Sequence, residues 1–172
     1  MKGTPGKIPL NMRESSHIEY KRSKSGLSKD IWETVSAFAN TAGGTILLGY
    51  ESRDDIFIPV GVEDPARLID DFTSTVSQKF NFCPMVRADL TEDNSVTVIV
   101  IEIEEALHYQ KPIYIKDAGP LKGGFKRIGA SDIKLSDEDI SRYYRERQGA
   151  PDAQPLPDST VDDIDQRAFT AF

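Results

Sequence analysis

The N-terminal part of the chain passes from strand-like to helix-like spacing of its hydrophobic residues. Hydrophobic and polar residues alternate over 17–21, with Ile18 and Tyr20 on one side, and this period of two predicts a strand. From Ser28 onward, apolar residues recur every three or four positions. This spacing predicts an amphipathic helix that ends at the Gly43-Gly44 pair.

A second group of elements is expected between residues 45 and 60. The continuous apolar run over 45–50 predicts a buried strand. Residues 51–55 are polar and predict a turn, after which 56–60 predict another strand. Because Pro59 has no backbone N–H to donate, we expect this strand at an edge or at a bulge.

The middle of the chain predicts a helix followed by two strands. Asp64 and Pro65 are a typical N-cap and first helical residue, and apolar residues follow at helical spacing as far as Phe80. Residues 86–90 predict a strand. Residues 96–103 are β-branched almost throughout and predict the strongest strand of the chain.

The remaining pattern completes the fold class. Residues 112–116 and 124–128 predict a hairpin-like pair of strands, and 136–147 predict a last helix. The total of about three helices and six or seven strands predicts an α+β (mixed α/β) domain with a mixed sheet. The order of the strands does not follow from this pattern.

Composition divides the chain into four segments. We expect 1–11 to be a flexible N-terminus and 12–148 to be the folded domain. Residues 149–160 are rich in Pro and small polar residues, as linkers are. Apolar residues within 161–172 are spaced as on one helix face, which predicts the start of a truncated downstream region. The alternative is a tail that packs back on the domain.

Charge and residue counts narrow the class of protein. The 172 residues carry a formal net charge of −7, which excludes a uniformly basic nucleic-acid-binding chain. Residues 1–30 nevertheless hold seven Lys or Arg against three Asp or Glu, a local net charge of +4. One Cys and two His exclude a disulfide framework and a structural zinc site. No apolar run is long enough for a membrane span and no secretory signal is visible, so we expect a cytoplasmic protein.

Three segments, in this order and spacing, resemble the Schlafen AlbA-2 domain, once described as a divergent AAA domain. They are ESSHIEYKR at 14–22, VSAFANTAGGTILLG at 35–49 and FKRIGAS at 125–131. The resemblance covers about residues 12–146. It implies a mixed α/β fold and nucleic-acid binding, at the N-terminus of a bacterial transcriptional regulator with an ATP-binding or winged-helix region downstream.

Related domains in animal Schlafen proteins are endoribonucleases, and the resemblance carries their acidic triad to this chain only in part. Two Glu of the family's first motif correspond to Glu14 and Glu19. No Asp stands at the third position, where Glu51 or Ser52 is found, and Glu51 could substitute for it. These carboxylates would hold Mg²⁺ or Mn²⁺ if the domain is a nuclease, whereas binding alone requires no cofactor. The animal enzymes join two such lobes, so a clamp here would require a homodimer.

The basic residues favour a nucleic-acid-binding surface, because Lys and Arg that neutralise phosphates give affinity independent of sequence. The expected contacts are Arg13, Lys21, Arg22, Lys24, Lys126 and Arg127. The structural alternative is a solvated charged face, with Lys21 in an ion pair with Glu19.

Two further motifs carry structural alternatives. The Gly pair at 43–44 is not a P-loop, because it has no Gly-Lys-Ser/Thr and follows a helix. We expect Asn40 to satisfy either the carbonyls at the end of the helix or the adjacent strand, and Gly43 to take a positive φ. Phe125 beside Lys126 and Arg127 could stack on a single strand or lie in the core.

Three functions therefore stay open. The first is a DNA- or RNA-binding module of a regulator. The second is a metal-dependent endoribonuclease, and the third is a protein-interaction or dimerisation domain.

Overall fold

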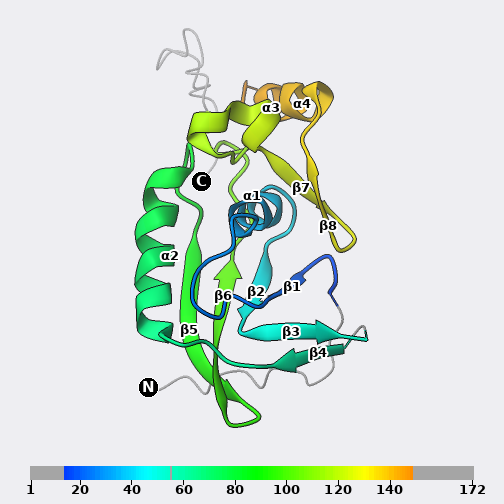
Figure 1. The fold of residues 1–172 in the computed structure, drawn as a ribbon. Helices are drawn as coiled ribbons and strands as arrows, with labels where there is room; N and C mark the ends of the chain where they lie inside the picture. The colour runs from blue at the N-terminus through cyan, green and yellow to red at the C-terminus, as the bar shows by residue number, and fades with distance from the viewer. Residues whose placement is uncertain (1–13, 55, 149–172) are drawn as a thin grey trace, which may run out of the picture.

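The computed structural model describes residues 14–54 and 56–148, and Figure 1 gives their arrangement. The elements, in chain order, are β1 (Ile18–Lys21), α1 (Ile31–Asn40), β2 (Gly44–Leu48), β3 (Tyr50–Arg53), β4 (Ile56–Pro59), α2 (Pro65–Lys79), β5 (Val86–Asp93), β6 (Val96–Ile103), the 3-10 helix η1 (Lys116–Ala118), α3 (Gly119–Gly123), β7 (Phe125–Ile128), β8 (Ser131–Lys134) and α4 (Asp137–Gln148).

A four-stranded mixed sheet with the order β1-β2-β6-β5 lies at the centre. β1 runs parallel to β2, which places Tyr20 opposite Leu47, and the other neighbours are antiparallel. The β5–β6 connection turns at Asn94 and Ser95, both with positive φ, as two-residue hairpin turns require. β3–β4 and β7–β8 are separate two-stranded hairpins.

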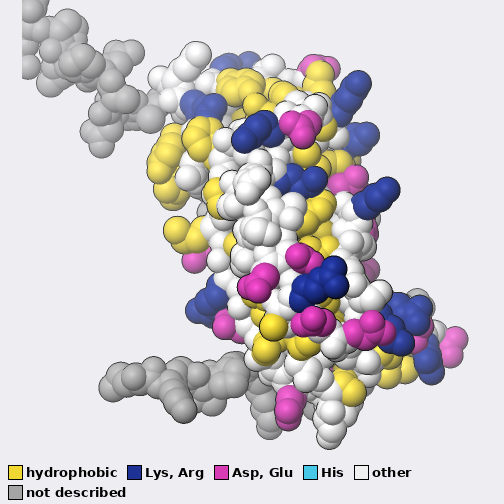
Figure 2. All heavy atoms as spheres, turned by 60° about the vertical axis from the view of Figure 1, so that its left-hand side comes forward, with side chains coloured by type: hydrophobic (Ala, Val, Ile, Leu, Met, Phe, Trp, Pro, Cys, Tyr) yellow, Lys and Arg dark blue, Asp and Glu magenta, His cyan; other side chains and the backbone are white. Residues whose placement is uncertain are grey.

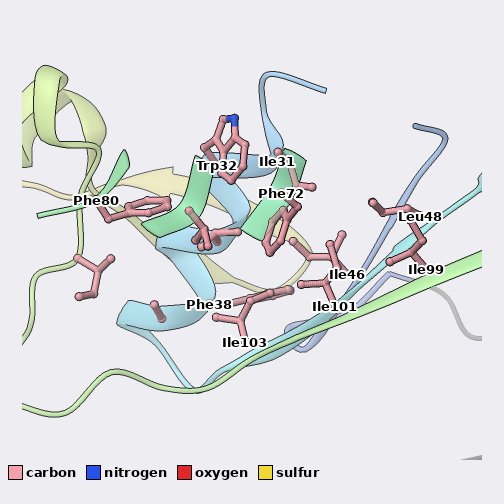
Figure 3. Packing of buried hydrophobic residues seen from close by; sticks show 14 of the residues in the cluster. Ile31, Trp32, Phe38, Ile46, Leu48, Phe72, Phe80, Ile99, Ile101 and Ile103 are labelled. Carbon is pink, nitrogen blue, oxygen red and sulfur yellow. The ribbon is translucent and has the colours of Figure 1, made fainter. Parts of the chain in front are cut away.

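The main core lies between one face of the sheet and the helices α1 and α2. Ile46 of β2 and Ile101 of β6 point toward Phe38 and Phe72, which come from the two helices (Figure 3). Trp32 stacks on Phe72 with ring centroids 5.4 Å apart. The amphipathic spacing of both helices is what places these rings on the sheet.

The opposite face of the sheet carries a smaller aromatic cluster under the β3–β4 hairpin. Tyr20 stacks on Phe57 with centroids 4.2 Å apart and meets Tyr50 edge-on. The Tyr50 hydroxyl donates to Asp93 at 2.8 Å, so β3 is tied to the end of β5. Burial, together with this hydrogen bond to Asp93, raises the pKa of Tyr50 and keeps it protonated.

The C-terminal half of the described chain caps the end of α1. Asn40 is buried, and its side-chain amide donates to the carbonyl oxygens of Ile113 and Phe125 at 2.8 and 2.9 Å and accepts from the Ile113 N–H at 2.7 Å. The Tyr143 hydroxyl of α4 donates to the Asn40 carbonyl. Through Asn40, α1 positions β7 and α4 at the upper end of Figure 1.

The α+β (mixed α/β) class is confirmed, with four α-helices and eight strands in the described residues. Two local expectations are wrong. The polar stretch after residue 50 is strand β3 rather than a turn. Residues 112–116 form no strand, because only isolated bridges join Tyr114 to Gly124 and Ile115 to Phe80, and β7 pairs with β8 instead.

Two expectations about glycine and proline are met. Gly43 has φ +67°, and an added Cβ would lie 2.7 Å from the Ile103 carbonyl oxygen, so the position requires glycine. Pro59 ends β4, whose one paired neighbour in the described chain is β3. The expected N-terminal extension, linker and downstream start at 1–11, 149–160 and 161–172 lie outside the described residues.

Candidate nucleic-acid interface

A network of charged side chains joins β1, α1 and the β7–β8 hairpin. The Glu19 carboxylate accepts from Lys21 at 3.0 Å and from Arg127 at 2.8 Å. Lys21 also donates to Asp30 at 2.6 Å, and Arg127 to Asp132 at 2.7 Å. The two cations therefore share Glu19, and each holds one further carboxylate.

The two cations of this network are buried, so their ion pairs join parts of the fold. The side chains of Lys21 and Arg127 are 8% and 1% exposed, and the Arg127 guanidinium also donates to the carbonyl oxygens of Ser15 and Ile18. It lies 5.0 Å from the Phe38 ring centroid. The phosphate contacts at Lys21 and Arg127 stay predictions, and in this structure both cations are largely buried in ion pairs. The expected Lys21–Glu19 ion pair is present.

Lys126 is also engaged. Its ammonium lies 2.7 Å from Asp139 of α4, which together with Ser136 forms a capping box at the start of that helix. Burial opposes ionisation of Asp139, but the hydrogen bonds from Lys126 and Ser136 outweigh it and lower its pKa to about 2. Phe125 is buried, so it belongs to the core rather than to a stacking surface.

The other predicted cations lie at the β1–β3 edge. Arg22 is exposed 3.4 Å from Glu51, and Lys24 is exposed 3.8 Å from Glu63. Exposed pairs of this kind are weak, so both side chains are free to exchange partners. Arg13 lies outside the described residues.

The predicted glutamates are only partly brought together. Glu14 and Glu19 are close enough to interact, and burial, followed by the Glu19 charge, raises the pKa of Glu14. Glu51 of β3 is held by Arg53 and Arg22, which lower its pKa. Within 14–54 and 56–148, no three His, Cys, Asp or Glu side chains gather as a metal ion would require. The metal centre of Glu14, Glu19 and Glu51 stays a prediction.

The cations that lack an acidic partner gather elsewhere. Among the described Lys and Arg residues outside every ion pair, all but Lys29 lie at the end of the molecule that carries η1, α3 and α4. We call this set the cationic end: Lys79, Lys116, Lys122, Lys134, Arg145 and Arg147.

The charge balance of the sequence agrees with this location. Residues 104–148 contain nine Lys or Arg and eight Asp or Glu, whereas the described residues before 104 contain eight and fourteen. Figure 2 shows Lys and Arg side chains prevailing in the upper part of this face and acidic ones in the lower part. Residues 104–148 therefore have a net charge of +1, against −6 for the described residues before them.

A groove of about 380 Å³ borders the cationic end between α2 and η1. It is lined by Ser74, Thr75, Gln78, Lys79 and Asp117. The Lys79 ammonium lies 5.5 Å from the Trp32 ring centroid. Hydroxyl, amide and ammonium groups are donors that suit phosphate oxygens, although Asp117 places one negative charge in the same groove.

Exposed aromatic rings lie beside these cations. The Arg147 guanidinium sits 5.3 Å from the Phe82 ring centroid and 5.7 Å from that of Tyr144, and its Nε donates to the Tyr109 carbonyl. Only part of this surface is local in sequence: Tyr144, Arg145 and Arg147 lie together on the last helix, where the pattern favours a packed face with a charged outer side. The other members, from Lys79 to Lys134, are scattered along the chain, so no sequence cluster like that of Arg13–Lys29 reveals them.

No helix in the described part of the chain is long and apolar enough to cross a membrane.

Comparison with known proteins identifies the family of this chain. Residues 14–136 match the family described as Schlafen, AlbA_2. The chain belongs to this family, as the three sequence motifs predicted. No match was found among curated protein sequences.

Two solved structures are similar. One is the N-terminal domain of a RecG-related protein from Nitrosomonas europaea, described as an ATP-dependent DNA helicase relative. It has 35% identity, a TM-score of 0.58 and coverage of 72% of this chain and 85% of that one. The other is the DIP2311 protein from Corynebacterium diphtheriae, with 18% identity, a TM-score of 0.51 and coverage of 76% and 24%, which supports the fold alone.

Proposed function

We propose that this domain binds nucleic acid and that the cationic end supplies the main phosphate contacts. The observation that carries the proposal is the gathering, at one end of an otherwise acidic molecule, of cations that form no ion pair within the described residues. Membership of the Schlafen AlbA_2 family and similarity to a helicase-related domain support a nucleic-acid-related role. Exposed Arg22 and Lys24 are secondary contacts in this proposal.

The electrostatics explain how a chain of net charge −7 can bind a polyanion. Each lysine placed on a phosphate releases a condensed counterion, so affinity falls steeply with salt. The acidic remainder of the surface repels the backbone and orients the strand toward the cationic end. Such contacts give position and affinity but carry no base specificity.

The test measures binding of the full chain to labelled single-stranded RNA, single-stranded DNA and duplex DNA over a salt series. We expect the double variant Lys116→Glu/Lys122→Glu to bind at least about tenfold more weakly at low salt, with the slope of log K against log salt reduced by about 2. The matched control is Arg67→Glu/Arg87→Glu, which changes the net charge equally at exposed positions away from the cationic end.

Unchanged binding by the lysine variant would refute the assignment, and so would an equal loss in the control, which would indicate a net-charge effect. The same reactions with Mn²⁺ test the endoribonuclease alternative. Metal-dependent cleavage of the probe would replace the binding proposal with that alternative.

A further inference from the structure

All the exposed aromatic residues of the described chain surround one arginine. Of the Phe, Tyr and Trp side chains in 14–54 and 56–148, only Phe82, Tyr109 and Tyr144 are exposed, by 40%, 61% and 37%. All three contact Arg147, by ring or by carbonyl. We call these four residues the aromatic–arginine cluster.

Each ring of this cluster is held by a different, anchored segment. Phe82 follows Asn81, whose side-chain amide donates to the Pro112 carbonyl and accepts from the Tyr114 N–H. Tyr109 lies in a turn that the Gln110 side chain closes by accepting from the Leu107 N–H. Tyr144 is on α4, next to buried Tyr143. The rings are therefore presented on fixed backbone.

We infer that the cationic end takes single-stranded nucleic acid, with bases stacked on the aromatic–arginine cluster and phosphates held by the neighbouring lysines. This inference rests on the proposed function and adds the class of polymer. Aromatic rings and arginine planes stack on bases of any sequence, which is how single strands are bound without base readout.

Two observations favour this ligand over an apolar protein partner. Arg147 has no carboxylate partner in the described chain, so the cluster carries an uncompensated positive charge among its rings. The nearby Arg145, Lys116 and Lys122 also stand outside every ion pair of residues 14–54 and 56–148, so the rim of the patch suits a polyanion. A duplex hides its base faces inside the stack and offers these rings only its backbone, so the stacking partner is a single strand.

The experiment compares the full chain with two double variants that differ only in the rings. Tyr109→Ala/Tyr144→Ala removes both rings, whereas Tyr109→Phe/Tyr144→Phe keeps them and removes the hydroxyls. The probes are a labelled oligouridine dodecamer, an oligothymidine dodecamer and a 12-base-pair DNA duplex. A single strand containing 2-aminopurine reports stacking through quenching of its fluorescence.

We expect the alanine variant to lose about tenfold to a hundredfold in single-strand affinity, with duplex affinity and the salt slope unchanged. The phenylalanine variant should bind like the parent and quench 2-aminopurine equally. Tyr109→Ala alone, at the most exposed ring, shows a smaller loss of the same kind and guards against misfolding at Tyr144.

The outcomes that would overturn the inference also show whether the proposed function survives. Equal single-strand binding by the alanine variant, or tighter binding of duplex than of single strand, would overturn the inference while leaving nucleic-acid binding intact. Absence of binding to every probe at low salt would remove the proposed function and this inference with it. An effect of the alanine variant on self-association alone would reassign the cluster to protein contact.

Discussion

Arg127 and Arg147 differ in what surrounds their guanidinium groups. Arg127 lies between Glu19 and Asp132 with 1% of its side chain exposed, so its charge is neutralised by ion pairs inside the protein. Arg147 meets two exposed rings and a backbone carbonyl, and its charge stays available. The availability of a cation, rather than its presence in a motif, decides whether it can serve a ligand.

Asp139 provides a residue-scale prediction about pH. Its pKa is about 2 rather than 3.8, so its contribution to stability is present above pH 3.8 and is lost as the pH falls through 2. We expect Asp139→Asn to lower the free energy of unfolding by about 2 kcal/mol at pH 7. The difference from the parent protein should shrink as the pH approaches 2.

Urea unfolding at pH 7 and at pH 3 or below measures this effect. The exposed neighbour Asp137 is the matched control, and Asp137→Asn should change stability far less. A penalty for Asp139→Asn that does not depend on pH would contradict the argument.

Single contacts of the site differ in whether the sequence could predict them. The Lys21–Glu19 pair was predictable, because residues two apart on a strand share a face. The pairing of Arg127 with Glu19, 108 residues away, was not, because it depends on how the β7–β8 hairpin meets β1. The burial of Arg127 follows from that tertiary contact, which no local pattern contains.

At the scale of elements, α1 does more than cover the sheet. Asn40 at its last turn fixes the segment around Ile113 and the start of β7 by hydrogen bonds to their backbone. These backbone groups lie at the edge of a strand-like segment that has few ladder partners of its own. The Asn40 amide therefore replaces strand pairing in this region.

We predict that Asn40→Ala lowers the free energy of unfolding by about 3 kcal/mol, because it leaves several buried backbone groups without partners. Asn40→Asp should also destabilise the fold, since a carboxylate cannot donate to the carbonyls of Ile113 and Phe125. Thermal unfolding measures both, with Glu33→Ala on the same helix as a control. A loss no larger than that of the control would refute this role for Asn40.

The helices and strands were largely predictable where the spacing of apolar residues within a single segment determines the element. The amphipathic spacing placed α2, and the capping pattern at Ser136 placed α4 within one residue of its observed start. The strand predicted over 112–116 is wrong, because this segment makes only isolated bridges and has no neighbouring strand in the described chain to pair with. Its hydrogen bonds go instead to side chains such as Asn40 and Asn81, which a period-two pattern does not reveal.

At the scale of the whole molecule, basic side chains prevail in the upper part of the face in Figure 2 and acidic ones in the lower part. The described residues before 104 carry fourteen acidic and eight basic residues, and the end with η1, α3 and α4 carries most of the described cations that stand outside every ion pair. The sequence indicated a basic N-terminal region, because seven cations lie within residues 1–30. Within the described residues, folding pairs Lys21, Arg22 and Lys24 with carboxylates, whereas the six cations of the cationic end stay outside every ion pair.

The position of Lys79 over Trp32 gives the molecule an optical readout. Trp32 is the single tryptophan of the chain, so emission excited at the red edge of the absorption band comes from this indole alone. Its ring is stacked on Phe72 and lies 5.5 Å from an ammonium that lines the groove of the cationic end. A phosphate that draws this ammonium away changes the electric field at the indole.

Titration with an unlabelled oligonucleotide should therefore shift the tryptophan emission in a saturable way. We predict that Lys79→Gln abolishes this shift, whereas Lys29→Gln, which removes an unpaired cation outside the cationic end, leaves it unchanged. A shift that persists in Lys79→Gln would mean that the indole senses a rearrangement of the core rather than a phosphate in the groove. In either case the unlabelled chain reports its own occupancy, because its single tryptophan lies beneath Lys79, which lines the groove that we assign to the ligand.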